Sequence, residues 1–263
     1  MKGRSRVFSI ELVPRDLDRF AEEVDEVCRR FKQFEWLNIP DIKRLPVRSH
    51  EAALAVGHTP LRRVPHLRAR DRSIEESLAI LRSLVEAGVG DVLIVSGDPS
   101  AGENEKAPTS LDVLRAAKDA DLRVRLWAAF DPYRGDLRAE LDYVQAKLEA
   151  GAVGLFTQPF FDLRMAEICL EQLEGIETFV GISPVTSEKS REYWERTNRV
   201  VFPPHFEATL EYCARLGGEL IRMCQSRGQH VYLMPIRVDA VAFIEATFAC
   251  AGPVQPVPMR EAF

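Results

Sequence analysis

The chain has 263 residues, of which 46% are hydrophobic and 29% are charged, and this composition excludes a disordered or collagen-like protein. Lys and Arg number 35 against 40 Asp and Glu. The net charge of −5 supplies no field for a polyanion, so we expect no nucleic-acid partner. No apolar run approaches the roughly eighteen residues that a membrane helix needs, so we expect no membrane partner either.

The start of the chain does not have the pattern of a signal peptide. MKGRSR is basic, but the apolar run that follows is short and ends at Glu11 without a small-residue cleavage site. Five cysteines lack CxxC or metal-ligand spacing and fall mostly in predicted helices: Cys28, Cys169, Cys213, Cys224 and Cys250. We therefore expect a reducing, cytoplasmic location, with no disulfide framework and no metal.

Short β-rich runs alternate with longer segments of helical periodicity along the whole chain. Eight runs predict strands, which are Val7–Leu12, Phe34–Asn38, Val64–Leu67, Asp91–Ser96, Val124–Ala129, Gly154–Gln158, Thr178–Ile182 and Val231–Ile236. One predicted helix follows each strand, at about 15–33, 47–57, 73–88, 109–120, 135–150, 164–174, 205–226 and 238–250.

This alternation predicts an α/β fold, a (β/α)8 TIM-type barrel. Eight units of this length match a closed barrel, whereas an open doubly wound sheet usually has fewer strands. The segment after the first strand, ELVPRD, also lacks the GxGxxG turn of the open nucleotide-binding fold. Ala87-Gly88 and Ala150-Gly151 are typical helix ends just before strands. We expect one domain over 1–263, with a long loop at about 183–204 that carries a short helix over the barrel mouth.

Functional residues of such barrels lie at the C-terminal ends of the strands. Polar residues occupy most of those ends here, and we expect them to gather at one rim. They are Glu11, Asn38 with Asp41 behind it, His66, Ser96-Gly97-Asp98, Asp131 after Phe130, Thr157-Gln158, Ser183 and Arg237.

Glu11 lies between Ile10 and Leu12 in an apolar strand. Burial of a carboxyl without a partner costs several kcal/mol or keeps it protonated, and a raised pKa suits a general acid. A carboxylate salt-bridged to Arg68 or Arg70 at the rim is the alternative, and the local sequence leaves both open.

Three other rim residues have structural alternatives. Asp98 stands between Gly and Pro, as a turn residue does. His66 could be a core histidine, a metal ligand or a cofactor contact, but no other histidine lies at ligand spacing, which argues against a metal. Gln158 could contact the edge of a planar heterocycle, whereas Phe160 and Phe161 are more typical of packing.

Seven segments resemble those of the methylenetetrahydrofolate reductase family in order and approximate spacing. The most specific is the AGA…TQPFFD block with GISPV some twenty residues later, and the resemblance spans about residues 7–240. The segments are FSIELVP (Phe8–Pro14), PHLRARD (Pro65–Asp71), SGD (Ser96–Asp98), AAF (Ala128–Phe130), KLEAGAVGLFTQPFFD (Lys147–Asp162), GISPV (Gly181–Val185) and TNRVVFP (Thr197–Pro203).

The resemblance implies an oxidoreductase with a (β/α)8 barrel that passes a hydride from NADH or NADPH, through FAD, to 5,10-methylenetetrahydrofolate. The product is 5-methyltetrahydrofolate. The family's proton donor falls on Glu11, which would protonate the folate as its five-membered ring opens to an iminium. Its aspartate near the flavin and the iminium charge falls on Asp98, and its contact for pterin and nicotinamide falls on Gln158.

Further substrate contacts are expected at Asn38, at Phe202 and at Arg237. The Arg237 guanidinium could meet the glutamate tail of the folate or a dinucleotide phosphate. A surface salt bridge is the alternative for Arg237.

The family's FAD-binding positions are only partly retained. They fall here on His66, Ser96, Asp98, Phe130, Glu140 and Lys147. Ser96 stands where the family has the arginine of an RGD motif, and Phe130 lacks the hydroxyl of the family's tyrosine. Ala146 replaces one of two basic residues, Asn38 replaces a threonine, and the stretch after Phe130 is the shortened DPYRGD. Each lost charge-assisted contact is worth about 1.5–3 kcal/mol, so we expect FAD to be weakly bound or absent.

Three functions remain open: a flavin-dependent reductase, a reductase in which the nicotinamide reduces the folate directly, and a catalytically silent folate-binding barrel or accessory redox subunit. The presence of Glu11 favours an enzyme, because burial of a carboxyl costs folding free energy that a functional role would explain. Homo-oligomerisation also stays open.

Overall fold

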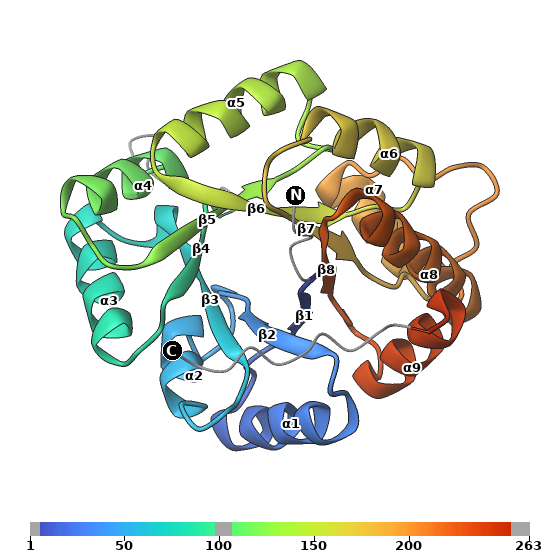
Figure 1. Cartoon of the computed structure of the whole chain (residues 1–263), viewed down its shortest axis with the longest axis horizontal. Coiled ribbons are helices and arrows are strands. Elements are labelled where there is room, and N and C mark those ends of the chain that lie inside the picture. Colours follow the sequence, from blue (N-terminus) through green and yellow to red (C-terminus); the bar gives the residue numbers. More distant parts are fainter. Residues whose placement is uncertain (1–5, 98–106, 254–263) are drawn as a thin grey trace.

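The computed structural model describes residues 6–97 and 107–253. Within them eight parallel strands close into a barrel, each pairing with the next along the chain and the last with the first (Figure 1). The predicted (β/α)8 fold is therefore confirmed. The strands are β1 (Phe8–Glu11), β2 (Phe34–Ile39), β3 (Arg62–Arg68), β4 (Asp91–Val95), β5 (Arg125–Phe130), β6 (Ala152–Pro159), β7 (Thr178–Ile182) and β8 (His230–Leu233).

Helices surround the barrel in chain order (Figure 1). Polar N-caps start several of them; α3, for example, begins with a capping box between Ser73 and Glu76. The left-handed Gly88 and Gly151 follow α3 and α5, as the Ala-Gly pairs predict. The α-helices are α1 (Leu17–Arg30), α2 (Ser49–Ala55), α3 (Ile74–Glu86), α4 (Ser110–Asp119), α5 (Leu137–Glu149), α6 (Leu163–Gln172), α7 (Glu188–Asn198), α8 (Leu210–Arg227) and α9 (Ala240–Ala251), and one 3-10 turn, η1, covers Ala69–Asp71.

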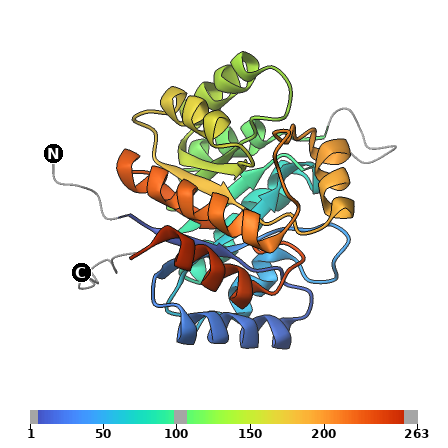
Figure 2. The same ribbon diagram turned by 90° about the vertical axis from the view of Figure 1, so that its right-hand side faces the viewer.

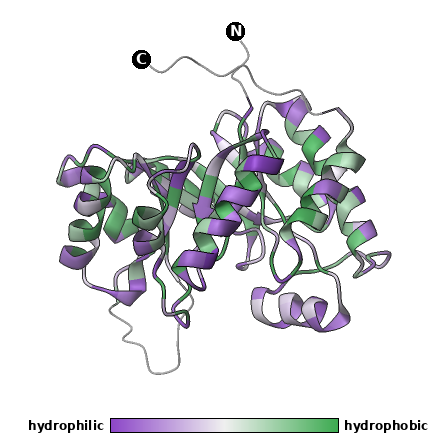
Figure 3. Ribbon diagram, turned by 90° about the horizontal axis from the view of Figure 1, so that it is seen from below, coloured by the Kyte–Doolittle hydropathy of each residue, from purple (hydrophilic) through white to green (hydrophobic). Residues whose placement is uncertain are grey.

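The long loop after β7 contains α7, which confirms the predicted helical piece in this loop. α7 stands apart from the ring of barrel helices (Figure 2). Its surface is largely hydrophilic, purple and white in Figure 3, and Trp194 is its buried residue. One side chain therefore anchors a helix that is otherwise exposed.

β8 is shorter than predicted. The run Val231–Ile236 suggested a longer strand, but the strand ends at Leu233. Pro235 has no N–H to donate to a ladder, which explains the early end. Arg237 therefore lies four residues beyond β8 and not on it, with the left-handed φ of 58° that non-glycine residues rarely adopt.

Large aromatic side chains fill the barrel interior. Phe156 and Phe179 stack with ring centroids 4.4 Å apart, and the edge of Trp127 meets Trp36 at 5.4 Å. Tyr232 adds its ring edge-on to Phe156 at 5.1 Å. A separate and larger apolar core lies between the strands and the helices. The interior beneath the C-terminal rim is thus a packed, low-dielectric plug.

The opposite end of the barrel is closed by a buried carboxylate, Asp91. It accepts hydrogen bonds from the guanidinium of Arg62, from Arg125 Nε at 2.9 Å and from Trp127 Nε1 at 2.8 Å. Both guanidinium groups also lie over the Trp36 ring, at 5.0 and 5.4 Å. Asp91 is fully buried but paired, as a buried charge must be.

Asp91→Ala should destabilise the fold by about 3 kcal/mol, because it leaves two guanidinium groups and an indole N–H without their acceptor. Urea unfolding should show a lower midpoint with an unchanged slope.

Asp119→Ala is the matched control, since Asp119 is an exposed carboxylate near the end of α4. It should stay within about 0.5 kcal/mol of wild type. An equal loss in both variants would contradict the role given to Asp91.

Candidate active site

Glu11 is the last residue of β1, and its side chain enters the barrel interior at the C-terminal end. It is 8% exposed, and burial raises the pKa of its carboxyl to about 7. The hydroxyl of Tyr232 donates a hydrogen bond to Glu11 Oε2, which lowers that pKa in part. Within the described residues, the carboxyl bonds to Tyr232 and has His66 nearby. Burial and a raised pKa suit a general acid, and that role of Glu11 stays a prediction.

His66 lies beside Glu11 but does not form an ion pair with it. The distance from His66 Nε2 to Glu11 Oε2 is 4.0 Å. Burial lowers the pKa of His66 to about 3, so the imidazole is neutral across the physiological range. A neutral neighbour leaves the raised pKa of Glu11 in place.

A chain of hydrogen bonds fixes the imidazole of His66. Ser9 Oγ donates to the Trp36 carbonyl and accepts from Asn38 Nδ2 at 2.6 Å, which leaves Asn38 Oδ1 to accept from His66 Nε2 at 3.0 Å. The order of donors assigns the proton of neutral His66 to Nε2. Asn38 is fully buried with both ends of its amide occupied, so it can act on a substrate only through His66.

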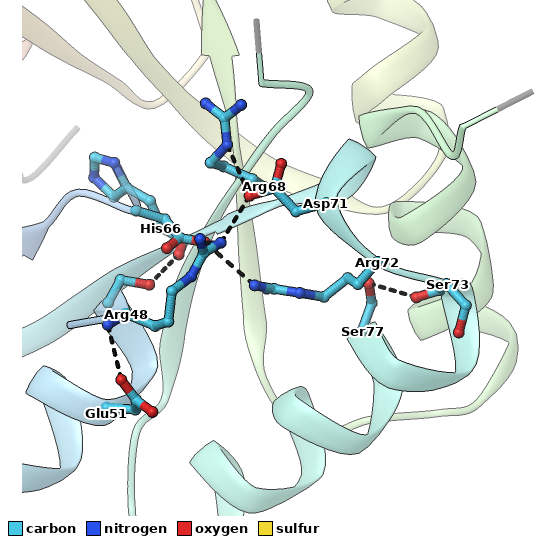
Figure 4. Close-up of polar contacts among 10 residues, drawn as sticks. Arg48, Glu51, His66, Arg68, Asp71, Arg72, Ser73 and Ser77 are labelled. Carbon is cyan, nitrogen blue, oxygen red and sulfur yellow. Dashed lines mark hydrogen bonds and ion pairs between the residues drawn. The ribbon is translucent and has the colours of Figure 1, made fainter. Parts of the chain in front are cut away.

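An ion-pair network holds the rim next to His66 (Figure 4). Arg48 Nη2 lies 2.8 Å from Asp41 and 2.7 Å from Asp71, and Arg72 lies 3.6 Å from Asp41. Ser49, the first residue of α2, donates its hydroxyl to the His66 carbonyl. The loops after β2 and β3 are thereby joined, and the backbone of His66 is fixed from outside the barrel.

Polar groups are accessible at the C-terminal end of the barrel. Gln158 is half-buried, whereas its neighbours Thr157 and Pro159 are buried. A cavity of about 300 Å³ lies next to Glu11, with charged residues in its wall: Arg15, Glu23, Arg237 and Asp239. The Arg237 guanidinium also lies 5.2 Å from the centre of the Tyr193 ring on α7. Arg237 therefore faces the same cavity as Glu11, in contact with the helix that stands outside the ring.

Comparison with known proteins decides the family. The family model described as methylenetetrahydrofolate reductase matches residues 36–222. The chain belongs to the methylenetetrahydrofolate reductase family. The 5,10-methylenetetrahydrofolate reductase of Escherichia coli (strain K12) is 29% identical over 148 residues, which are 53% of this chain and 50% of that protein. The enzyme of the same name from Pectobacterium carotovorum subsp. carotovorum is 28% identical over 152 residues, 55% of this chain and 51% of that protein. The matched region thus spans about half the length of these relatives.

Solved structures agree on the barrel. An uncharacterised protein from Clostridium thermocellum, described as binding two copies of 5-methyl-5,6,7,8-tetrahydrofolic acid, superposes with a TM-score of 0.69 at 14% identity, over 95% of both chains. An oxaloacetate acetylhydrolase in complex with 3,3-difluorooxalacetate superposes with a TM-score of 0.59 at 11% identity, over 92% of this chain and 80% of that one. At these identities the likeness concerns the fold alone.

The predicted flavin contacts at Lys147 and Glu140 are occupied by protein groups. Lys147 is 1% exposed; its Nζ donates to the Ala129 carbonyl at 2.6 Å and lies 3.3 Å from Glu140. Burial lowers the pKa of Lys147 to about 8. Glu140 also accepts from the Asp131 amide at 3.1 Å. Neither side chain presents a free charge to a pyrophosphate.

Ser96 and Phe130, the two substituted flavin positions, also contact other protein groups. Ser96 donates to Ser110, whose hydroxyl bonds in turn to Tyr143. The Phe130 ring is fully buried in the core between strands and helices. The described residues of this set therefore do not fit FAD as the family pattern would hold it. Asp98 lies outside the described residues.

Phe202, predicted to contact substrate, packs beneath α7. Its ring lies 4.9 Å from Phe161 and 4.4 Å from Phe206, and it is 7% exposed. Phe161 is likewise buried, as its packing interpretation predicts.

The sequence analysis missed Tyr232 and Ser9, which complete the polar interior. A signal was present for Tyr232, because the first and last strands of a closed barrel are neighbours. In the described residues no helix is long and apolar enough to cross a membrane, and no three His, Cys, Asp or Glu side chains form a group that could hold a metal.

Glu11→Gln should change how stability depends on pH. The folded-state pKa of Glu11 is raised, so its contribution is fully present below about pH 4.5 and is lost as pH rises towards 7. The wild-type free energy of unfolding, relative to the variant, should fall by on the order of 2–3 kcal/mol between pH 4.5 and 7.5.

Urea unfolding of both proteins across this range measures the difference. The lowered pKa of His66 acts in the opposite sense, because its contribution is lost as pH falls from about 6.5 towards 3. It is common to both proteins and cancels. A difference that does not change with pH would mean that Glu11 is ionised in the folded state.

Proposed function

We propose that this chain reduces 5,10-methylenetetrahydrofolate to 5-methyltetrahydrofolate with NADH or NADPH as hydride donor. The observation that carries the proposal is Glu11, a carboxyl with a pKa raised to about 7 at the mouth of a barrel of this family. Such a group is about half protonated at pH 7 and can donate its proton.

The chemistry needs a proton and a hydride at different atoms. Glu11 would protonate the nitrogen that leaves as the five-membered ring opens, and hydride would then add to the iminium carbon to form the methyl group. For Gln158, half-buried at the end of β6, we propose a hydrogen bond to the edge of the pterin. Arg237, on the cavity next to Glu11, is suited to the carboxylates of the glutamate tail or to a dinucleotide phosphate. For Asp98 we propose stabilisation of the iminium charge.

In this proposal the nicotinamide transfers its hydride to the folate directly, or through FAD that is only weakly bound. Lys147, Glu140, Ser96 and Phe130 are all committed to protein contacts, and the fifth described position of the family's flavin pattern, His66, bonds to Asn38 through Nε2. Direct transfer from the nicotinamide uses the same acid, Glu11. We place the enzyme in the cytoplasm, on its cysteine usage.

Glu11→Gln should fold normally but lose at least about 100-fold in kcat for folate-dependent NADH or NADPH oxidation, because an amide cannot supply the proton. The assay follows nicotinamide absorbance with 5,10-methylenetetrahydrofolate as substrate.

Gln158→Ala is the comparison variant and should chiefly raise KM for the folate, since it removes a binding contact and not the acid. Activity of Glu11→Gln within a few-fold of wild type would refute the acid role.

Purified protein should be colourless, or should lose its flavin on extensive dialysis. Two missing charge-assisted contacts correspond to a loss of about a hundredfold or more in affinity. The visible absorption spectrum before and after dialysis measures this. A stoichiometric yellow protein that retains its flavin would show that other residues replace the missing contacts.

A further inference from the structure

Tyr232 contacts the proposed proton donor from the far end of the chain. It is on β8, whose pairing with β1 places Tyr232 opposite Ser9, two residues before Glu11. Its side chain is buried in the barrel interior, where the ring packs edge-on against Phe156. The hydroxyl is directed at Glu11 and donates to it. The family resemblance gives Tyr232 no role.

The carboxyl of Glu11 is held asymmetrically. Tyr232 bonds to Oε2, and His66 Nε2 faces the same oxygen at 4.0 Å. The His66 N–H is engaged by Asn38, so the Tyr232 hydroxyl is the hydrogen-bond donor that serves the carboxyl within the described residues. Oε1 is thereby left for the substrate.

We propose that Tyr232 is a positioning residue for proton transfer: its hydroxyl holds Glu11 by Oε2 so that Oε1 carries the proton towards the folate nitrogen. This inference rests on the proposed function. As the proton leaves Oε1, the negative charge that remains is stabilised by the phenolic donor on Oε2. Solvent from the adjacent cavity then restores the proton.

The same hydrogen bond sets the strength of the acid. Donation to the charged form favours ionisation, so Tyr232 counteracts part of the rise that burial causes in the pKa of Glu11. The other titratable groups around Glu11 are neutral His66 on β3 and the charged side chains of the cavity wall. The latter are two cations, Arg15 and Arg237, and two acids, Glu23 and Asp239. Their charges balance, which leaves the phenol as the group that tunes the carboxyl.

Tyr232→Phe tests the inference, because it keeps the ring and removes only the hydroxyl. We expect kcat to fall about 10-fold to 100-fold, with KM for the folate within about twofold of wild type. The alkaline limb of the pH–rate profile should move up by about one pH unit, since the acid stays protonated to higher pH. An unmoved limb in an active variant would overturn the inference.

Tyr133→Phe is the matched control. Tyr133 is another buried tyrosine, and its hydroxyl donates to the Pro159 carbonyl at 2.9 Å, away from Glu11. It should lose a similar hydrogen bond without any movement of the alkaline limb. Equal movement of the limb in both variants would contradict a specific role for Tyr232.

An infrared measurement separates this inference from the proposed function. The difference spectrum of free wild-type protein and Glu11→Gln identifies the C=O band of protonated Glu11. In Tyr232→Phe this band should move to higher wavenumber, because the carboxyl has lost its donor. Wild-type protein without folate-dependent NADH or NADPH oxidation would overturn the proposed function, whereas an unmoved band would overturn the positioning by Tyr232.

Discussion

The chemistry of the site depends on the removal of one carboxyl from water. Glu11 is removed from water at the end of a barrel strand, above a plug of aromatic rings, and is given a neutral hydroxyl and a neutral imidazole as neighbours. Within the described residues the group that bonds to its carboxyl is a phenol and not a cation, so burial outweighs that hydrogen bond and the pKa rises to about 7. If an arginine occupied the place of Tyr232, the same carboxyl would be ionised at neutral pH and could not serve as an acid.

At the other end of the barrel, a buried carboxyl has cationic neighbours instead of neutral ones. Asp91 is surrounded by two guanidinium groups and an indole N–H, and their hydrogen bonds to the carboxylate close the barrel. Trp127, through its N–H and its ring, belongs both to this closure and to the interior plug. One barrel therefore has a structural carboxylate at one end and, at the other, the carboxyl that we propose as proton donor, and the difference lies in the charge of their neighbours.

The sequence predicted the repeating elements well because strands and helices have local periodicities. The eight units could be inferred from the alternation of strand and helix patterns. Glu11 stood out as an acidic residue inside an apolar strand. The end of β8 was misjudged because apolar Met234 and Ile236 extend the pattern past Pro235. The closed barrel implied that a residue of the last strand lies near Glu11, but not which one, since Tyr232 is 221 residues away. Glu140 and Lys147 are seven residues apart on α5, and their use depends on how α5 packs against β5, where Lys147 Nζ bonds to the Ala129 carbonyl. The two side chains match the family's flavin pattern in sequence, but in the fold they bind each other.

In the folded, ligand-free protein, Glu11 should keep its proton well above pH 4.5 and be half ionised only near pH 7. A carboxyl carbon-13 NMR titration of glutamate-labelled protein tests it most directly, with the Glu11 signal identified by its loss in Glu11→Gln. We expect one glutamate to titrate with a midpoint near pH 7, well above the usual value of about 4.5. A Glu11 signal that titrates near pH 4.5, with the other glutamates, would contradict it.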